Sequence, residues 1–170
     1  MLLKKEKTLY RPEIQTLRAF AVLAVVFYHA DFRFFQGGFF GVDIFFVISG
    51  YLITSICLST LFRNNNLKEN LFLFYLKRAK RILPVFFVIL LIIYFTSYFI
   101  FLPNDLAETA LQGIFSTLFL SNYYFYLTQY SYQEGVGAFY NILLHTWSLS
   151  LEVQFYLVYP IILIIIFKYF

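Results

Sequence analysis

Two apolar segments near the N-terminus, joined by a Gly-Gly turn, carry ionisable side chains where a helix in a bilayer is normally apolar. Arg18 and His29 lie in the first segment, and Asp43 lies in the second. An ionisable group at lipid depth is costly to bury, so it indicates a functional site. Because a helix turns about 100° per residue, the eleven-residue spacing of Arg18 and His29 places both on one helix face, about 16 Å apart along the axis.

The composition places the chain in a membrane. Of its 170 residues, 61% are hydrophobic and 13% are charged, and the mean hydropathy is +0.74. A soluble domain carries about 25% charged residues and could not hide this much apolar surface. The net charge of +4 comes from basic residues at the ends of apolar runs, which is typical of membrane topology and not of nucleic-acid binding. We therefore predict an all-α fold, a polytopic transmembrane helix bundle.

The distribution of basic residues predicts the topology. Residues 1–13 are rich in lysine and form a cytoplasmic N-terminal tail, and residues 14–170 form the transmembrane domain. The basic segment 63–81 returns to the cytoplasm after two crossings, and its later part is an amphipathic helix that leads into the third. Four crossings are expected, over residues about 14–35, 39–62, 84–102 and 149–170.

A weaker apolar helix is expected over about 106–127, with Asn104 as its N-cap. The segment after it, 128–144, contains Glu134 and no lysine or arginine, which argues against a cytoplasmic position. The lysine of the last apolar run, Lys168, lies at its far end. These charges favour a re-entrant or surface-lying helix, an external loop after it, and a last crossing that runs inward.

His29 is the first candidate for catalysis, because an imidazole moves protons near neutral pH and its neutral form can lie in a bilayer. The alternative is a histidine that only packs between helices. Arg18 on the same face, with Asp31 and Asp43 near the turn, favours a functional role.

Arg78 and Arg81 are three residues apart on the amphipathic helix, so they share a face at the cytoplasmic interface. Guanidinium forks match phosphate oxygens in bidentate geometry, and this face could hold a phosphorylated ligand. Anchoring to anionic lipid headgroups would explain the same pair.

The segment HTWSLSLEVQFY, residues 145–156, carries Glu152 inside an apolar run, where an ionised carboxylate needs a partner. His145 shares its face if the helix begins that early, and Ser148 lies between them. A serine at helical spacing is weak evidence for a hydrolase-like dyad. The single cysteine, Cys57, excludes an internal disulfide and a cysteine-built metal site, and the sequence shows no other cluster of metal ligands.

Three blocks in this order resemble the membrane acyltransferase-3 family of bacterial O-acyltransferases that modify cell-surface glycans. They are Arg18 and His29 with GGFFGVDIFFVISGYLIT, then KRAKRILP, then HTWSLSLEVQFYLVYP. The family's usual start reads closer to RPEIDGLRA, and here Gln15 and Thr16 replace Asp-Gly. The resemblance covers nearly the whole chain from Tyr10.

The resemblance implies a membrane O-acyltransferase. Such enzymes take an acyl group, most often from acetyl-CoA as donor substrate, on the cytoplasmic side and deliver it to a carbohydrate hydroxyl outside. The resemblance also implies that the chain lies in a bacterial inner membrane with its N-terminus in the cytoplasm. Its motifs fall on six residues of this sequence: catalytic His29, Arg18, Asp43 and Glu152, and the donor-binding pair Arg78 and Arg81.

Members of the family typically carry about ten membrane helices, so residues 14–170 correspond to roughly the first half of the membrane domain. Three interpretations stay open beside an active enzyme. The chain could be a truncated product, one piece of a split enzyme whose C-terminal half is on another chain, or a non-catalytic remnant that binds a partner or lipid. Intramembrane charge also marks the pathways of transporters.

Overall fold

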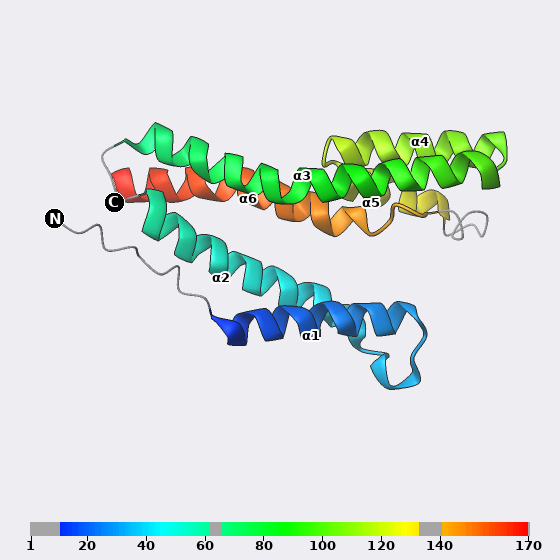
Figure 1. Cartoon of the computed structure of the whole chain (residues 1–170), viewed down its shortest axis with the longest axis horizontal. Coiled ribbons are helices and arrows are strands. Elements are labelled where there is room, and N and C mark those ends of the chain that lie inside the picture. Colours follow the sequence, from blue (N-terminus) through cyan, green and yellow to red (C-terminus); the bar gives the residue numbers. More distant parts are fainter. Residues whose placement is uncertain (1–10, 62–65, 133–140, 170) are drawn as a thin grey trace. The chain divides into compact units, whose positions relative to one another are not determined.

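The computed structural model describes residues 11–61, 66–132 and 141–169. These residues form six α-helices and two short 3-10 helices and no strand (Figure 1), which confirms the predicted all-α fold. The chain divides into two compact units, Met1–Ser55 and Ile56–Phe170, which are described separately. Most of the lysine-rich tail and Glu134 lie outside the described residues.

The N-terminal unit contains α1 (Pro12–His29), η1 (Arg33–Phe35), η2 (Gly38–Phe40) and most of α2 (Gly41–Leu61). Pro12 stands at the first position of α1, where its missing N–H costs nothing, and Glu13 in the first turn complements the helix dipole. The Gly-Gly turn lies between α1 and α2, as predicted.

The C-terminal end of α1 differs from the prediction of a helix over 14–35. Asp31 has a φ of 54°, the left-handed conformation that ends a helix. The Phe32 N–H then bonds to the Phe27 carbonyl at 3.0 Å, and the Asp31 N–H bonds to that of Tyr28 at 3.1 Å. This is a Schellman motif, with the expected hydrophobic contact supplied by the rings of Phe27 and Phe32 at 5.5 Å.

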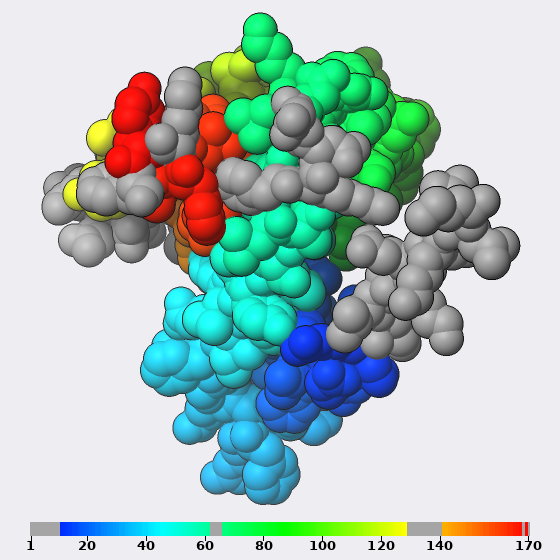
Figure 2. All heavy atoms as spheres, turned by 90° about the vertical axis from the view of Figure 1, so that its left-hand side faces the viewer, coloured from blue at the N-terminus to red at the C-terminus, as the bar shows by residue number. Residues whose placement is uncertain are grey.

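Small residues bring α1 into close contact with the segment after the turn (Figure 2, dark and light blue). A Cβ added at Gly38 would clash with the Ala24 carbonyl oxygen, and one added at Gly41 would clash with that of Ala21. Both alanines are buried. Helices in membranes pack through such small residues because their backbones can then approach closely.

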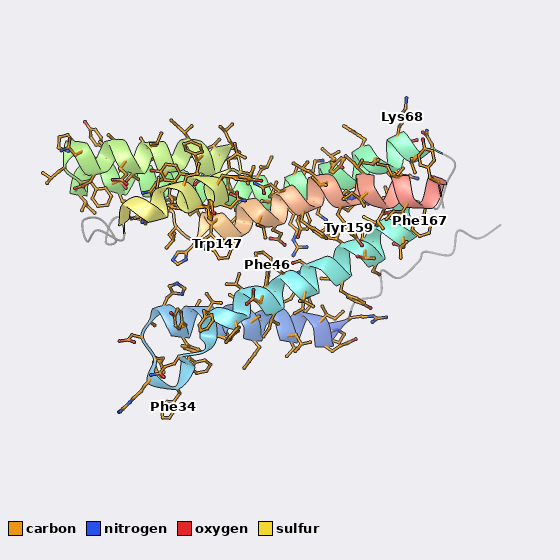
Figure 3. The ribbon with its side chains drawn as sticks, turned by 180° about the vertical axis from the view of Figure 1, so that it is seen from behind. Phe34, Phe46, Lys68, Trp147, Tyr159 and Phe167 are labelled. Carbon is orange, nitrogen blue, oxygen red and sulfur yellow. The ribbon has the colours of Figure 1, made fainter. Side chains whose placement is uncertain are left out.

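The second unit contains α3 (Leu67–Ile100), α4 (Pro103–Thr117), α5 (Ser121–Tyr132) and α6 (Thr146–Tyr169). The amphipathic segment and the third crossing form one continuous helix, α3, with Pro84 in its interior. At 34 residues it is about 51 Å long, which exceeds the roughly 30 Å of a hydrocarbon core. In Figure 3, Lys68 and Phe167 lie at one end of this unit and Trp147 lies farther along, so α3 and α6 run antiparallel.

The predicted helix over 106–127 is wrong, because two helices occupy this stretch. Pro103 is the first residue of α4 and Leu102 is its N-cap, so Asn104 lies inside the helix. A second Schellman motif ends α4, with Phe119 at a φ of 54° and the Leu120 N–H bonded to the Phe115 carbonyl at 2.8 Å. With 15 and 12 residues, α4 and α5 are each shorter than the about 20 residues that a crossing needs.

Three segments of the described chain are long and apolar enough to cross a membrane: Gly38–Leu61, Leu67–Ile100 and Thr146–Phe167. They agree with the second, third and fourth predicted crossings. Helix α1 is not among them, and the first predicted crossing stays a prediction.

Side-chain hydrogen bonds tie α4, α5 and α6 together. The hydroxyls of Ser116, Ser121 and Thr146 lie 2.8–2.9 Å from one another, one from each helix. The Gln154 amide donates to the Phe119 carbonyl at 2.7 Å and to the Asn122 side chain at 2.9 Å. Such bonds are needed where water is excluded, because an unpaired polar group in the hydrocarbon core of a membrane costs on the order of several kcal/mol.

We expect Gly41→Ala to destabilise the chain by about 1–3 kcal/mol, because its Cβ would overlap the α1 backbone. The measurement is unfolding by SDS titration in mixed micelles. Gly50→Ala, on the same helix, is the control, since an added Cβ there meets nothing within 4 Å. Equal effects at the two glycines would contradict the close-contact explanation.

Thr146→Val keeps the shape of the side chain and removes the hydroxyl shared with Ser116 and Ser121. We expect it to destabilise the chain by about 1–2 kcal/mol in the same titration. Thr117→Val is the matched control, because its exposed hydroxyl bonds only to the Gly113 carbonyl of its own helix. A loss at Thr117 as large as that at Thr146 would show that the network contributes nothing.

Candidate functional site

Arg18, the first candidate of the N-terminal unit, is half-buried on α1, and its guanidinium lies 5.0 Å from the centroid of the Phe45 ring on α2. Arg11 makes a similar contact with the Tyr51 ring and donates to the Tyr51 hydroxyl at 2.7 Å. An aromatic face attracts a cation through its quadrupole. Aromatic rings of α2 therefore hold both arginines.

His29 is the last residue of α1, so Arg18 and His29 lie on one helix as the spacing predicts. Asp43 is exposed in the first turn of α2, where the helix dipole favours a carboxylate. The structure thus brings two of the three predicted residues onto one helix and leaves the third at the start of the next.

The His29 ring is oriented by its own helix. Its Nδ1 lies 2.9 Å from the Val25 carbonyl oxygen, and the Tyr28 ring meets it edge-on at 5.3 Å. A carbonyl only accepts, so Nδ1 carries the proton, and the neutral ring then has its lone pair on Nε2. This tautomer makes Nε2 the atom that can take a proton from a substrate.

In the second unit the structure brings Arg78 and Glu152 into one cluster, through Tyr156 and Phe74. The Tyr156 hydroxyl donates to a Glu152 carboxylate oxygen. The Arg78 guanidinium lies 5.4 Å from the Tyr156 ring centroid and 5.6 Å from that of Phe74. Arg78 also interacts electrostatically with Glu152, so a cation of α3 and a carboxylate of α6 meet around one tyrosine.

This aromatic cluster (Phe74, Arg78, Glu152 and Tyr156) lies about half-way along an apolar segment. Tyr156 is about 15 Å by helix rise from the start of Thr146–Phe167 and slightly farther from its end. A further hydrogen bond, from the Tyr75 hydroxyl to the Leu157 carbonyl at 2.9 Å, holds α3 and α6 together beside the cluster.

Arg81 has different surroundings from Arg78. It is exposed and lines an apolar groove of about 440 Å³ between α3 and the start of α6. The polar residues of the groove besides Arg81 are His145 and Thr146. His145 directly precedes α6, so the helix does not begin early enough to place His145 on the same helix face as Glu152.

The contacts of Tyr156 and Phe74 with the site were not predicted, because the sequence offered Tyr156 only as a residue of the interfacial aromatic belt and gave Phe74 no role. Tyr156 follows Glu152 by one helical turn, and Phe74 precedes Arg78 by the same spacing. Side chains four residues apart on a helix are neighbours, so this spacing was a usable signal. The contact between Arg78 of α3 and Tyr156 of α6 is not indicated by any spacing in the sequence.

Three helices long and apolar enough to cross a membrane, in a chain whose helices also carry guanidinium, imidazole and carboxylate groups, define a polytopic membrane protein. The chain belongs to the acyltransferase-3 family, whose model, described as an acyltransferase domain, matches residues 11–170. The match includes all six predicted site residues and confirms the resemblance.

The relatives of the chain include peptidoglycan O-acetyltransferase OatA of Listeria monocytogenes, which is 40% identical over 94% of this chain. O-acetyltransferase OatA of Staphylococcus aureus is 38% identical over 91%, and the putative peptidoglycan O-acetyltransferase YrhL of Bacillus subtilis is 39% identical over 92%. The chain spans about a quarter of the length of these relatives. No solved structure gives a significant match.

The orientation of His29 predicts its tautomer. The measurement is an NMR spectrum of ¹⁵N-histidine-labelled protein in micelles, recorded at a pH where the imidazole is neutral. We expect the correlation pattern of a ring protonated at Nδ1. The chain has two histidines, and His145→Asn identifies the signal of His29. A pattern with the proton on Nε2 would contradict the hydrogen bond to Val25.

Proposed function

We propose that the chain takes part in O-acyl transfer across a bacterial inner membrane. It moves an acyl group, most simply acetyl, from acyl-CoA at the cytoplasmic face to a carbohydrate hydroxyl on the outer side. The family match over residues 11–170 carries this proposal, because it includes the imidazole, the guanidiniums and the carboxylates that such a reaction uses. The names of the relatives favour peptidoglycan as the acceptor.

The donor is a phosphorylated thioester, and two arginines are suited to hold it. Arg78 and Arg81 stand one turn apart on α3, and a guanidinium fork matches phosphate oxygens in bidentate geometry. Arg81 also lines an apolar groove, the kind of surface that accepts an aliphatic arm. Arg18 adds a third positive charge for the donor.

His29 acts as the general base. Its Nε2 takes the proton of the acceptor hydroxyl while the oxygen attacks the thioester carbonyl, forming the ester C–O bond and breaking the C–S bond. The proton then passes to the leaving thiolate, so acyl-CoA and alcohol become ester and CoA thiol. A less favoured alternative makes Nε2 the transient acyl carrier. In either case a carboxylate orients or charges the ring, and Asp43 is the candidate in the same unit as His29.

Two alternatives give results different from those of an enzyme in an assay of CoA release. A non-catalytic membrane protein releases no CoA and binds no donor, and a transporter moves solute without consuming thioester.

We expect His29→Ala to lower acyl transfer by a factor of about 10²–10⁴, the usual contribution of a general base. The measurement is CoA-thiol release from acetyl-CoA by the chain in vesicles supplied with peptidoglycan fragments. Thr16→Ala on the same helix should leave the rate unchanged, because this exposed hydroxyl bonds only to the Pro12 carbonyl. Full activity of inserted His29→Ala would overturn the assignment.

A further inference from the structure

Tyr156 contacts two of the predicted site residues at once, one from each helix. Its hydroxyl bonds to Glu152 on α6, and the Arg78 guanidinium of α3 lies over its ring. The side chain is buried, with 8% of its surface exposed. A buried tyrosine with both its face and its hydroxyl engaged fixes the positions of both partners.

The ring and the hydroxyl do different things. A guanidinium that lies over an aromatic ring uses its flat face, and its N–H donors, which lie in its plane, can still bond to an anion. Phe74 provides a second ring for the same cation. The two rings therefore hold the Arg78 guanidinium in place and leave its N–H donors able to bond to an anion.

The hydroxyl acts on the carboxylate. Glu152 lies inside the apolar segment Thr146–Phe167, where an ionised carboxylate depends on hydrogen-bond donors. The phenol supplies one from a residue on the same helix, four positions later. This bond selects one rotamer of Glu152 and keeps its charge on the side of Tyr156 and Arg78.

We propose that Tyr156 is a positioning residue of the acyl-transfer site, an inference that rests on the proposed function. Its ring aims the Arg78 guanidinium at a phosphate of the acyl-CoA donor, and its hydroxyl holds Glu152 in the orientation needed for the transfer step. The two tasks are separable, because phenylalanine keeps the ring and lacks the hydroxyl.

The test compares Tyr156→Phe with Tyr156→Leu in steady-state CoA release from vesicles. Tyr156→Phe keeps the support of Arg78, so we expect a donor KM within about twofold of wild type and a kcat lowered about tenfold by the lost bond to a charged group. Tyr156→Leu loses the ring as well, and we expect a donor KM at least about fivefold higher.

Tyr159→Phe and Tyr159→Leu are the matched controls. Tyr159 lies on the same helix and stacks on Phe155 at 4.7 Å. We expect both controls to keep the donor KM and kcat near wild type once rates are normalised to folded protein. The split between KM and kcat separates positioning from stability, because a smaller folded fraction lowers the apparent kcat and leaves KM unchanged.

The outcomes distinguish this inference from the proposed function. Wild-type chain that releases no CoA, alone and with the C-terminal part of a relative added, would overturn the proposed function and this inference with it. Active wild type, with Tyr156→Phe and Tyr156→Leu both at wild-type kcat and KM, would overturn the role of Tyr156 alone. A fall in kcat with unchanged KM in both variants would show that the ring does not aim Arg78.

Discussion

A positive charge placed within apolar helices has to be stabilised by something other than water, and this chain uses aromatic rings. The guanidiniums of Arg18 and Arg78 each lie within 6 Å of a ring centroid. A ring stabilises a cation without cancelling its charge, whereas a carboxylate partner would neutralise it. Arg18 is stabilised in this way by the Phe45 ring, 5.0 Å from its guanidinium.

The contacts of Arg11 and Arg18 depend on how closely α1 and α2 approach each other. Beside the turn, Gly38 and Gly41 let the backbone of the following segment touch that of α1. At the other end of α1, Arg11 reaches Tyr51, 40 residues along the chain. The two helices are therefore held at both ends, by backbone contact at one and by a hydrogen-bonded cation at the other.

Local patterns predicted much of the fold, and both helix ends that they missed lie at left-handed residues other than glycine. Hydrophobic runs and the Gly-Gly turn placed α2, α3 and α6, and the spacing of Arg18 and His29 placed both on α1. Helices commonly end at a left-handed glycine, and here Asp31 and Phe119 take that conformation. For Phe119 the cause is tertiary, because its ring packs on Phe86 of α3 at 5.2 Å, a contact invisible in the local sequence.

The candidate site, like the fold, was predictable from the sequence where it depends on local spacing and not where it depends on packing between helices. Residue type and spacing identified Arg78 and Glu152 separately, since each is a charge within or beside an apolar run. That they share Tyr156 depends on the register between α3 and α6, which the Tyr75–Leu157 bond helps to fix. This register follows from side-chain packing along two whole helices, and no single spacing in the sequence encodes it.

Because Tyr156 contacts both Arg78 and Glu152, it also supports each charge separately. An anion that binds a guanidinium already committed to a buried ion pair must first separate that pair, at a cost of several kcal/mol, roughly 3–5 where one buried partner is lost. In the aromatic cluster the Glu152 carboxylate has a phenol donor of its own, and Arg78 has two rings. Under the proposed function, a phosphate of the donor binds the Arg78 guanidinium while Glu152 keeps its hydrogen bond from Tyr156, so the carboxylate stays supported as the donor binds and leaves.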